Sequence, residues 1–187
     1  KKINIAVFIS GAGSNFKNLI KHSLKKNSKF NISLVISNKS KAKGLDFANR
    51  YKIDKKIIKY LNIKNAEKNI LNELKKRKID LICLAGFMKI LTNNFIKKFK
   101  GKIINIHPSL LPKYKGLNTH QRALNNNEKF SGCTVHYVNS KLDSGKIILQ
   151  KKVRILKTDI SDQLAKRVLK QEHLLYPKAL KKVLTNL

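Results

Sequence analysis

The N-terminal segment constrains the fold most strongly, because it has the pattern of a buried strand, a glycine loop and a helix in direct succession. Residues 3–9 (INIAVFI) form a nearly continuous apolar run with several β-branched residues, which is typical of a central parallel strand buried on both faces. The loop Ser10-Gly11-Ala12-Gly13-Ser14-Asn15 follows, and residues 16–21 then have helical spacing. This succession predicts an α/β protein.

The glycine loop also predicts an anion site. Backbone N–H groups at the start of a helix, with hydroxyl and amide side chains beside them, can cradle an anion. Phe16 stands where the third glycine of a dinucleotide fingerprint would fall, and no Gly-Lys-Ser/Thr sequence follows as in a P-loop. The loop therefore favours a phosphate monoester over NAD or ATP. The alternative is an ordinary tight turn between strand and helix.

Strand and helix patterns alternate through the first hundred residues. Apolar runs predict strands at 32–36, 57–58 and 80–84, and amphipathic spacing predicts helices at 42–51 and 65–76. This alternation predicts a doubly wound, mostly parallel sheet. The apolar loop at 85–91 follows a strand, where a ligand site is expected, so it could contact a flat aromatic ligand. The alternative is that its side chains only pack in the core.

The second half of the chain has a different pattern. After an irregular loop at 113–118 and a short helix around 121–124, strands at 132–138 and 147–153 predict an antiparallel pair. A long C-terminal helix is predicted over 161–187, capped by Ser161 or Asp162 and interrupted at Pro177. No linker or repeat divides the chain, so we expect one domain over 1–187, with halves of about 1–100 and 101–187.

Asn105 and His107 are candidate catalytic side chains. They lie at the end of an apolar run, and residues two apart in a strand project from the same face. Pro108 cannot donate to a sheet ladder, so the strand has to end at His107, at the edge where open α/β sheets bind ligands. An amide can hydrogen-bond an oxyanion and an imidazole can carry a proton near neutral pH, so the pair suits acyl chemistry. The alternative is a turn-capping Asn105 and a satisfied, partly buried His107.

Asp143 lies in the loop predicted to join the last two strands, and it is one of only ten acidic residues in the chain. If its carboxylate reaches His107, it would stabilise the imidazolium, raise the pKa of the histidine and fix its orientation. The alternative is a solvated turn aspartate.

The formal net charge of +32 does not by itself indicate a nucleic-acid partner. Only five of the 42 basic residues are arginine, the side chain that usually reads base edges, and the lysines are scattered beside abundant asparagine and isoleucine. Drift in composition accounts for them, although a positive field could help to collect an anionic small substrate. We therefore expect small-molecule substrates, no nucleic acid and no membrane, since no apolar run approaches the length of a membrane span.

The two cysteines, Cys83 and Cys133, are far apart and form no ligand-spaced cluster with histidine. Their pattern favours a reducing, cytoplasmic setting and argues against a structural zinc or a disulfide framework. The N-terminus lacks the pattern of a cleaved signal peptide.

Five stretches together resemble the phosphoribosylglycinamide formyltransferases, the glycinamide ribonucleotide transformylases that use 10-formyltetrahydrofolate. They occur in the family's order over nearly the whole length: residues 10–15 (SGAGSN), 84–91 (LAGFMKIL), 105–112 (NIHPSLLP), 142–145 (LDSG) and 171–173 (QEH). The resemblance implies a formyltransferase-like fold: α/β, with a doubly wound, mostly parallel sheet, an antiparallel C-terminal strand pair and a long C-terminal helix. It also implies a phosphate-binding N-terminal half, a folate and catalytic C-terminal half, no metal, and a monomer or weak homodimer.

The resemblance further implies roles for individual residues. The catalytic residues would be Asn105, His107 and Asp143. The ribonucleotide phosphate would be held by Gly13, Ser14 and Asn15, and glycinamide ribonucleotide would also contact Glu172. The folate co-substrate would contact residues from both halves of the chain: Lys64, Met88, Lys89, Ile90, Leu91, Asn105, Ser140, Lys141, Leu142 and Asp143. Lys89 stands where the family usually has arginine, which would remove a bidentate contact. Lys115 replaces a usual proline and should loosen the loop after the Leu-Leu-Pro turn.

The implied reaction is formyl transfer to the amine of glycinamide ribonucleotide in de novo purine biosynthesis. Other enzymes that use 10-formyltetrahydrofolate are alternatives. A methionyl-tRNA formyltransferase shares the central motif, but we expect it to carry a further C-terminal domain and to need no phosphate loop. A formyltetrahydrofolate hydrolase would carry an N-terminal regulatory domain. A non-catalytic nucleic-acid-binding module is a third alternative, which rests on charge alone.

Overall fold

The computed structural model describes residues 2–186, and the chain divides into two compact units at Ile104 and Asn105. The expectation of one domain with halves meeting near residue 100 remains a prediction.

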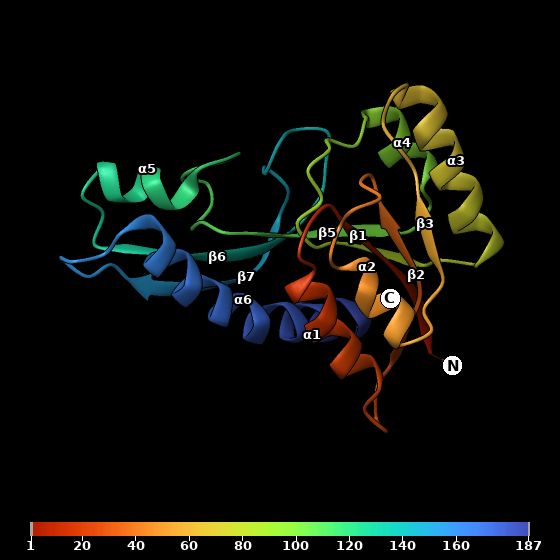
Figure 1. The fold of residues 1–187 in the computed structure, drawn as a ribbon, viewed down its shortest axis with the longest axis horizontal. Coiled ribbons are helices and arrows are strands. Elements are labelled where there is room, and N and C mark those ends of the chain that lie inside the picture. The colour runs from red at the N-terminus through yellow and green to blue at the C-terminus, as the bar shows by residue number, and fades with distance from the viewer. Residues whose placement is uncertain (1, 187) are drawn as a thin grey trace. The chain divides into compact units, whose positions relative to one another are not determined.

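The first unit is a parallel α/β structure (Figure 1). Strand β1 pairs with β2 and β4, and β2 pairs with the edge strand β3, all in parallel. In Figure 1, α1 and α2 lie on one side of these strands and α3 and α4 on the other, as in a doubly wound arrangement. The elements are β1 (Ile3–Ile9), α1 (Ser14–Ser23), β2 (Phe30–Ser37), α2 (Leu45–Arg50), β3 (Lys55–Ile57), α3 (Ile63–Lys76), β4 (Leu81–Leu84) and α4 (Asn93–Lys98).

The core of this unit follows the predicted pattern. Residues 5–9 of β1 have no exposed surface, because the strand has neighbours on both edges and helices on both faces. Helix α4 is missing from the prediction. Its start is set by Thr92, whose hydroxyl accepts a hydrogen bond from the Phe95 N–H at 3.1 Å. Phe95 is the one buried residue of this six-residue helix, so the sequence shows no clear helical periodicity there.

The second unit contains the predicted antiparallel pair. Strands β6 (Phe130–Tyr137) and β7 (Ile147–Arg154) run antiparallel, with Cys133 opposite Lys151. Helix α6 (Ser161–Leu184) packs against both strands and against α5 (Thr119–Asn125), and Figure 1 shows α6 running alongside the pair. Strand β5 (Lys102–His107) crosses the division between the two units.

Two predictions about α6 are wrong. Pro177 does not interrupt the helix, which continues through it to Leu184. The apolar side of α6 explains this, since Tyr176, Pro177 and Leu180 are all buried and their packing outweighs the lost backbone hydrogen bond. The N-cap is Ile160, with no side-chain cap, rather than Ser161 or Asp162. The predicted last residue, Leu187, lies outside the described residues.

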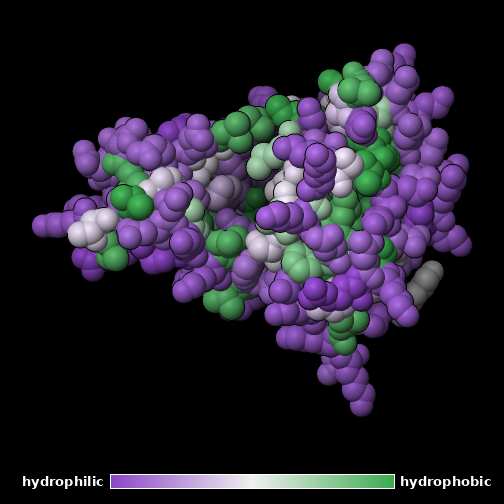
Figure 2. Space-filling view, in the orientation of Figure 1, coloured by the Kyte–Doolittle hydropathy of each residue, from purple (hydrophilic) through white to green (hydrophobic). Residues whose placement is uncertain are grey.

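Hydrophilic residues cover most of the face shown in Figure 2, which agrees with the high lysine content. Among residues 2–186, no helix combines the length and the apolar composition that a membrane span requires. Neither Cys83 nor Cys133 forms a disulfide, and both are buried.

Candidate active site

The glycine loop after β1 is shaped by contact between two backbones. Gly13 has a φ of 71° and immediately precedes α1, and a Cβ at this position would lie 2.6 Å from the Cα of Gly44. Gly44 in turn donates from its N–H to the carbonyl of Gly11 at 2.9 Å. Only glycine fits this approach, and the loop then leads directly into the first turn of α1, the part of a helix whose N–H groups can meet an anion. Of the predicted phosphate ligands, Gly13 and Asn15 are buried and Ser14 is half-buried.

Ser10 connects the loops that follow three strands of the first unit. Its hydroxyl donates to Asn38 Oδ1 at 2.5 Å and accepts from the Met88 N–H at 2.7 Å. Its N–H donates to the carbonyl of Gly86 at 3.1 Å. The predicted phosphate loop and the predicted folate loop are therefore joined through one buried side chain.

The predicted folate loop after β4 presents exposed apolar side chains. Met88 and Ile90 are 60% and 67% exposed, whereas Leu91 is buried at the end of the loop. The ammonium group of Lys89 lies 6.0 Å from the centroid of the Tyr60 ring, and Lys64 is exposed near the start of α3. Exposed apolar surface next to basic side chains suits a ligand with a flat ring and a carboxylate tail.

The motif after β5 is fixed by a set of buried hydrogen bonds within the second unit. The Thr134 hydroxyl donates to the carbonyl of Ser109 at 2.6 Å and accepts from the Leu111 N–H at 3.1 Å. Gln150 donates to the carbonyl of Leu111 at 2.8 Å, and the Leu111–Pro112 peptide bond is cis. These contacts from β6 and β7 hold the turn that begins at Pro108, and with it the position of His107.

His107 and Asp143 come together as predicted. His107 Nδ1 lies 3.4 Å from Asp143 Oδ2, and each side chain is only 8% exposed. At the other ring nitrogen, Nε2 lies 2.9 Å from the carbonyl of Tyr114. Asp143 Oδ2 also accepts from the Gly116 N–H at 2.9 Å. Both ring nitrogens of His107 therefore face acceptors, an arrangement that only the imidazolium satisfies fully.

The pKa of His107 is nevertheless lower than its ordinary value, because burial disfavours the charged ring. The Tyr114 carbonyl and Asp143 raise it, and the charges of His136 and Arg122 lower it further. Asp143 thus acts on the pKa of His107 in the predicted direction, but desolvation by burial is the larger effect. Burial raises the pKa of Asp143, but the hydrogen bond from the Gly116 N–H and the interactions with His136 and His107 outweigh it, so the pKa is lowered.

His136 is a site residue that the sequence prediction missed. It is 2% exposed, and its Nδ1 donates to the carbonyl of Tyr137 at 2.8 Å, which leaves Nε2 facing the site. Nε2 lies 3.3 Å from Asn105 Nδ2 and 3.6 Å from Asp143 Oδ1. His136 therefore links the predicted amide to the predicted carboxylate. The sequence does indicate His136 as a candidate, because it lies two residues after the polar Thr134 in a mostly apolar strand. The same alternation identifies Asn105 and His107.

The turn that carries Asp143 is held by Gly145. A Cβ at Gly145 would lie 1.6 Å from the carbonyl oxygen of Tyr137, so no other residue fits without moving the turn. Asp143 itself has a φ of 44°, and Ser140, Lys141 and Leu142 are exposed. Residues 140–142 are therefore accessible to a ligand, while the carboxylate of Asp143 is buried beside His107.

Glu172 lies on α6 and is 7% exposed. Its charge and the burial of Cys133 together raise the pKa of that thiol to about 12, with burial the larger cause. The carboxylate is thus close to the β6 strand that also carries His136. Across residues 2–186, no group of three His, Cys, Asp or Glu side chains is arranged to hold a metal ion.

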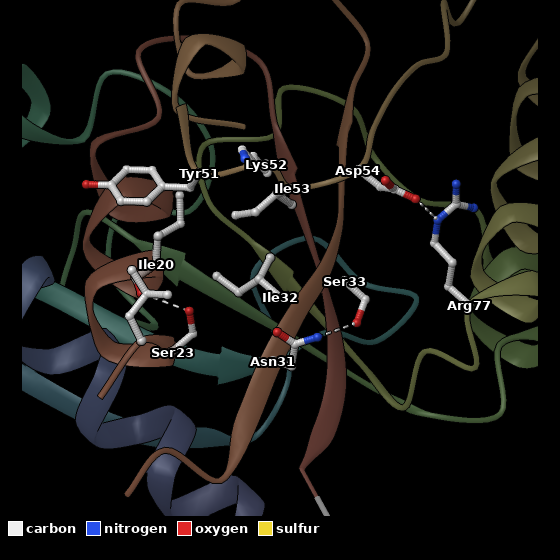
Figure 3. Close-up of a pocket in the computed structure, with 11 residues that line it drawn as sticks. Ile20, Ser23, Asn31, Ile32, Ser33, Tyr51, Lys52, Ile53, Asp54 and Arg77 are labelled. Carbon is white, nitrogen blue, oxygen red and sulfur yellow. Dashed lines mark hydrogen bonds and ion pairs between the residues drawn. The ribbon is translucent and has the colours of Figure 1, made fainter. Parts of the chain in front are cut away.

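A separate cavity of about 430 Å³ lies in the first unit (Figure 3). Apolar side chains such as Ile20 and Ile32 form part of its lining, and Arg77 pairs with Asp54 across 3.1 Å at one side. None of the predicted site residues lines it.

Residues 3–180 match the protein family described as formyl transferase. The chain belongs to this family. It is 43% identical to the phosphoribosylglycinamide formyltransferase of Haemophilus influenzae, over 95% of this chain and 85% of that protein. It is 44% identical to the human trifunctional purine biosynthetic protein adenosine-3, over 98% of this chain but only 18% of that protein, so it spans about a fifth of that relative.

The comparison with solved structures agrees. The crystal structure of phosphoribosylglycinamide formyltransferase from Anaplasma phagocytophilum matches with a TM-score of 0.92 and 43% identity, covering 100% of this chain and 89% of that one. The predicted resemblance to these formyltransferases and the predicted formyltransferase-like fold class are therefore confirmed. The roles of individual site residues remain predictions.

Proposed function

We propose that the chain transfers the formyl group of 10-formyltetrahydrofolate to the primary amine of glycinamide ribonucleotide, a step of de novo purine biosynthesis. The observation that carries the proposal is the buried pair of His107 and Asp143, with Asn105 linked to it through His136. This cluster occurs in a chain that aligns with most of a bacterial phosphoribosylglycinamide formyltransferase.

In the proposed reaction, the amine nitrogen attacks the formyl carbon directly and the carbonyl oxygen becomes an oxyanion. The Asn105 amide has a second N–H besides the one that faces His136, and this N–H would donate to the oxyanion. Protonated His107 would add its charge, and Asp143 would keep the ring protonated and oriented. A bound water carries the amine proton to the departing folate nitrogen as the carbon–nitrogen bond breaks, so no covalent enzyme intermediate forms.

The charge state of His107 fits this role. Burial lowers the pKa of the ring, whereas a developing negative charge nearby would favour the imidazolium. Two acceptors already face its ring nitrogens, so protonation requires no rearrangement. The site is thus poised to gain a proton when the oxyanion forms.

Substrate contacts are assigned by unit. In the first unit, Gly13, Ser14 and Asn15 at the start of α1 would hold the phosphate, since N–H groups there bind anions. Lys64, Met88, Lys89, Ile90 and Leu91 would contact the folate. In the second unit, Glu172 would contact glycinamide ribonucleotide, and Asn105 and residues 140–143 would contact the folate.

The buried cysteines, neither of which forms a disulfide, fit a cytoplasmic protein. We propose that the partners are these two small molecules alone, that no metal takes part, and that the chain is a monomer or a weak homodimer.

The test is to mix the protein with both substrates and to measure formylated ribonucleotide and free tetrahydrofolate by mass spectrometry. Product that requires both substrates supports the proposal. Release of formate without glycinamide ribonucleotide would indicate the hydrolase, and formylation of methionyl-tRNA would indicate the tRNA enzyme. Asp143→Asn, which keeps the shape of the side chain, is the matched control for catalysis by a contaminant.

A further inference from the structure

The backbone segment 114–118 connects the two members of the His107–Asp143 pair. The Tyr114 carbonyl faces His107 Nε2 at 2.9 Å, and the Gly116 N–H donates to Asp143 Oδ2 at 2.9 Å. Both contacts are made by main-chain atoms, so they depend on the conformation of the segment rather than on its side chains. A shift of the segment would disturb the histidine and the aspartate together.

This conformation is one that a free chain rarely adopts. Tyr114 and Asn118 both have a φ of 56°, and Gly116 has a φ of 78°. Non-glycine residues in the left-handed region are strained, so contacts from outside have to hold the segment.

Arg122 on α5 supplies those contacts. Its Nη1 donates to the carbonyl of Lys115 at 2.7 Å and to that of Leu117 at 3.2 Å. Its guanidinium also lies 5.2 Å from the centroid of the Tyr114 ring, while the Tyr114 hydroxyl donates to Glu128 at 2.8 Å. The guanidinium of Arg122 thus contacts the segment at three residues, Tyr114, Lys115 and Leu117.

We propose that Arg122 is a positioning residue for catalysis: it holds segment 114–118 so that the Tyr114 carbonyl and the Gly116 N–H keep His107 and Asp143 aligned. The inference rests on the proposed function for its catalytic consequence, but its effect on His107 can be measured without any substrate. Lys115 adds a second link, because its ammonium donates to Ser144 Oγ at 2.6 Å, in the turn that carries Asp143. A proline at this position could not make that contact.

The experiment compares Arg122→Lys and Arg122→Gln with the exposed-charge control Lys157→Gln. Lysine keeps the charge but has no planar fork, so it separates positioning from electrostatics. For each protein we would measure kcat, the KM of both substrates, the pH profile of kcat, and the pKa of His107 by NMR titration of its imidazole nitrogens. Arg122 is exposed, so both variants should fold, and thermal unfolding checks this.

The expected result is a kcat about tenfold to a hundredfold lower in both Arg122 variants, with smaller changes in KM. In Arg122→Lys the pKa of His107 should fall, because the Tyr114 carbonyl that raises it is no longer held in place. Asp143, His136 and His120 also interact electrostatically with His107, so their protonation is followed in the same titration. Lys157→Gln should match the wild type in every measurement.

If Arg122→Lys has the same kcat and the same His107 pKa as the wild-type protein, the proposal is overturned, because a positive charge alone would then be enough to keep the site aligned. A kcat above that of the wild type would also overturn it, since the segment would then restrain the site. If the wild-type protein transfers no formyl group, the proposed function fails, yet the His107 titration still decides whether Arg122 positions the ring.

Discussion

The carboxylate of Asp143 lies 3.4 Å from the imidazole of His107, although one residue ends a strand and the other belongs to a distant turn. The turn can bring the carboxylate inside because Gly145 lets the chain pass against the carbonyl of Tyr137. The pair depends on backbone geometry at both ends, so we expect it to respond to changes at residues that never touch a substrate.

His107→Ala and Asp143→Ala should each fold normally and lose most of kcat. Removing one group that stabilises an oxyanion typically lowers the rate by roughly a hundredfold to a thousandfold. Steady-state assays with both substrates measure the loss, and circular dichroism checks the fold. Asp162→Ala, which removes an exposed carboxylate in the first turn of α6, is the control. Near-native turnover in either active-site variant would rule out its assigned role.

Gly13→Ala should destabilise the protein by about 2–4 kcal/mol. The added methyl group would meet the Cα of Gly44 at 2.6 Å, and the φ of 71° is strained for any residue with a side chain. Gly11→Ala is the matched control for stability, because nothing lies within 4 Å of its Cβ position. Urea unfolding of the three proteins tests this. Equal midpoints for the two variants would contradict the proposed backbone contact.

Lys89→Arg should lower the KM for 10-formyltetrahydrofolate by about fivefold, which is the effect of roughly 1 kcal/mol from one added charge-assisted hydrogen bond. Arginine presents a planar fork to a carboxylate, whereas lysine presents a point charge. Lys97→Arg, an exposed change on α4, serves as the control. An unchanged folate KM in Lys89→Arg would show that this side chain does not contact the folate.

The stability of the protein should fall as the pH drops below about 6.5. Burial lowers the pKa of His107 and of His120 in the folded state, so the unfolded chain binds more protons between those lowered values and the ordinary value of 6.5. The neutral rings therefore contribute fully to the free energy of unfolding above pH 6.5. This contribution is lost as the pH falls through the pKa values that the two histidines have in the folded protein. Asp143 keeps its contribution to lower pH, since its own pKa is lowered.

Chemical unfolding at about pH 7.5 and about pH 5 measures this effect. His120→Gln should lose less stability between the two values than the wild type. An equal loss in both proteins would exclude His120 as one of the groups responsible.

The arrangement of strands was predictable because burial leaves a direct mark on the sequence. The apolar run of β1 and the polar residues at 105 and 107 each indicate an environment that local spacing determines. From the residues alone, a contact between Asp143 and His107 is one of two alternatives, since no local pattern encodes which turn reaches which strand; the family resemblance favours the contact.

Other features had no signal in the side-chain pattern. The Tyr114 carbonyl and the Gly116 N–H are main-chain groups, and any residue type carries them. The continuity of α6 through Pro177 depends on tertiary packing, which overrides the local preference of proline. The alternation of His136 with Thr134 does indicate a site residue, but the apolar pattern of the strand that carries it is typical of the hydrophobic core.

The hydroxyl of Ser10 gives the two predicted ligand loops of the first unit a shared mechanical support. The same oxygen accepts from the Met88 N–H and donates to Asn38, so we expect a phosphate bound in the glycine loop to steady Met88 in the predicted folate loop as well. The two ligands should therefore bind with synergy. Ser10→Ala is expected to weaken that synergy more than it weakens the binding of either ligand alone, as calorimetric titration of each ligand with and without the other would reveal.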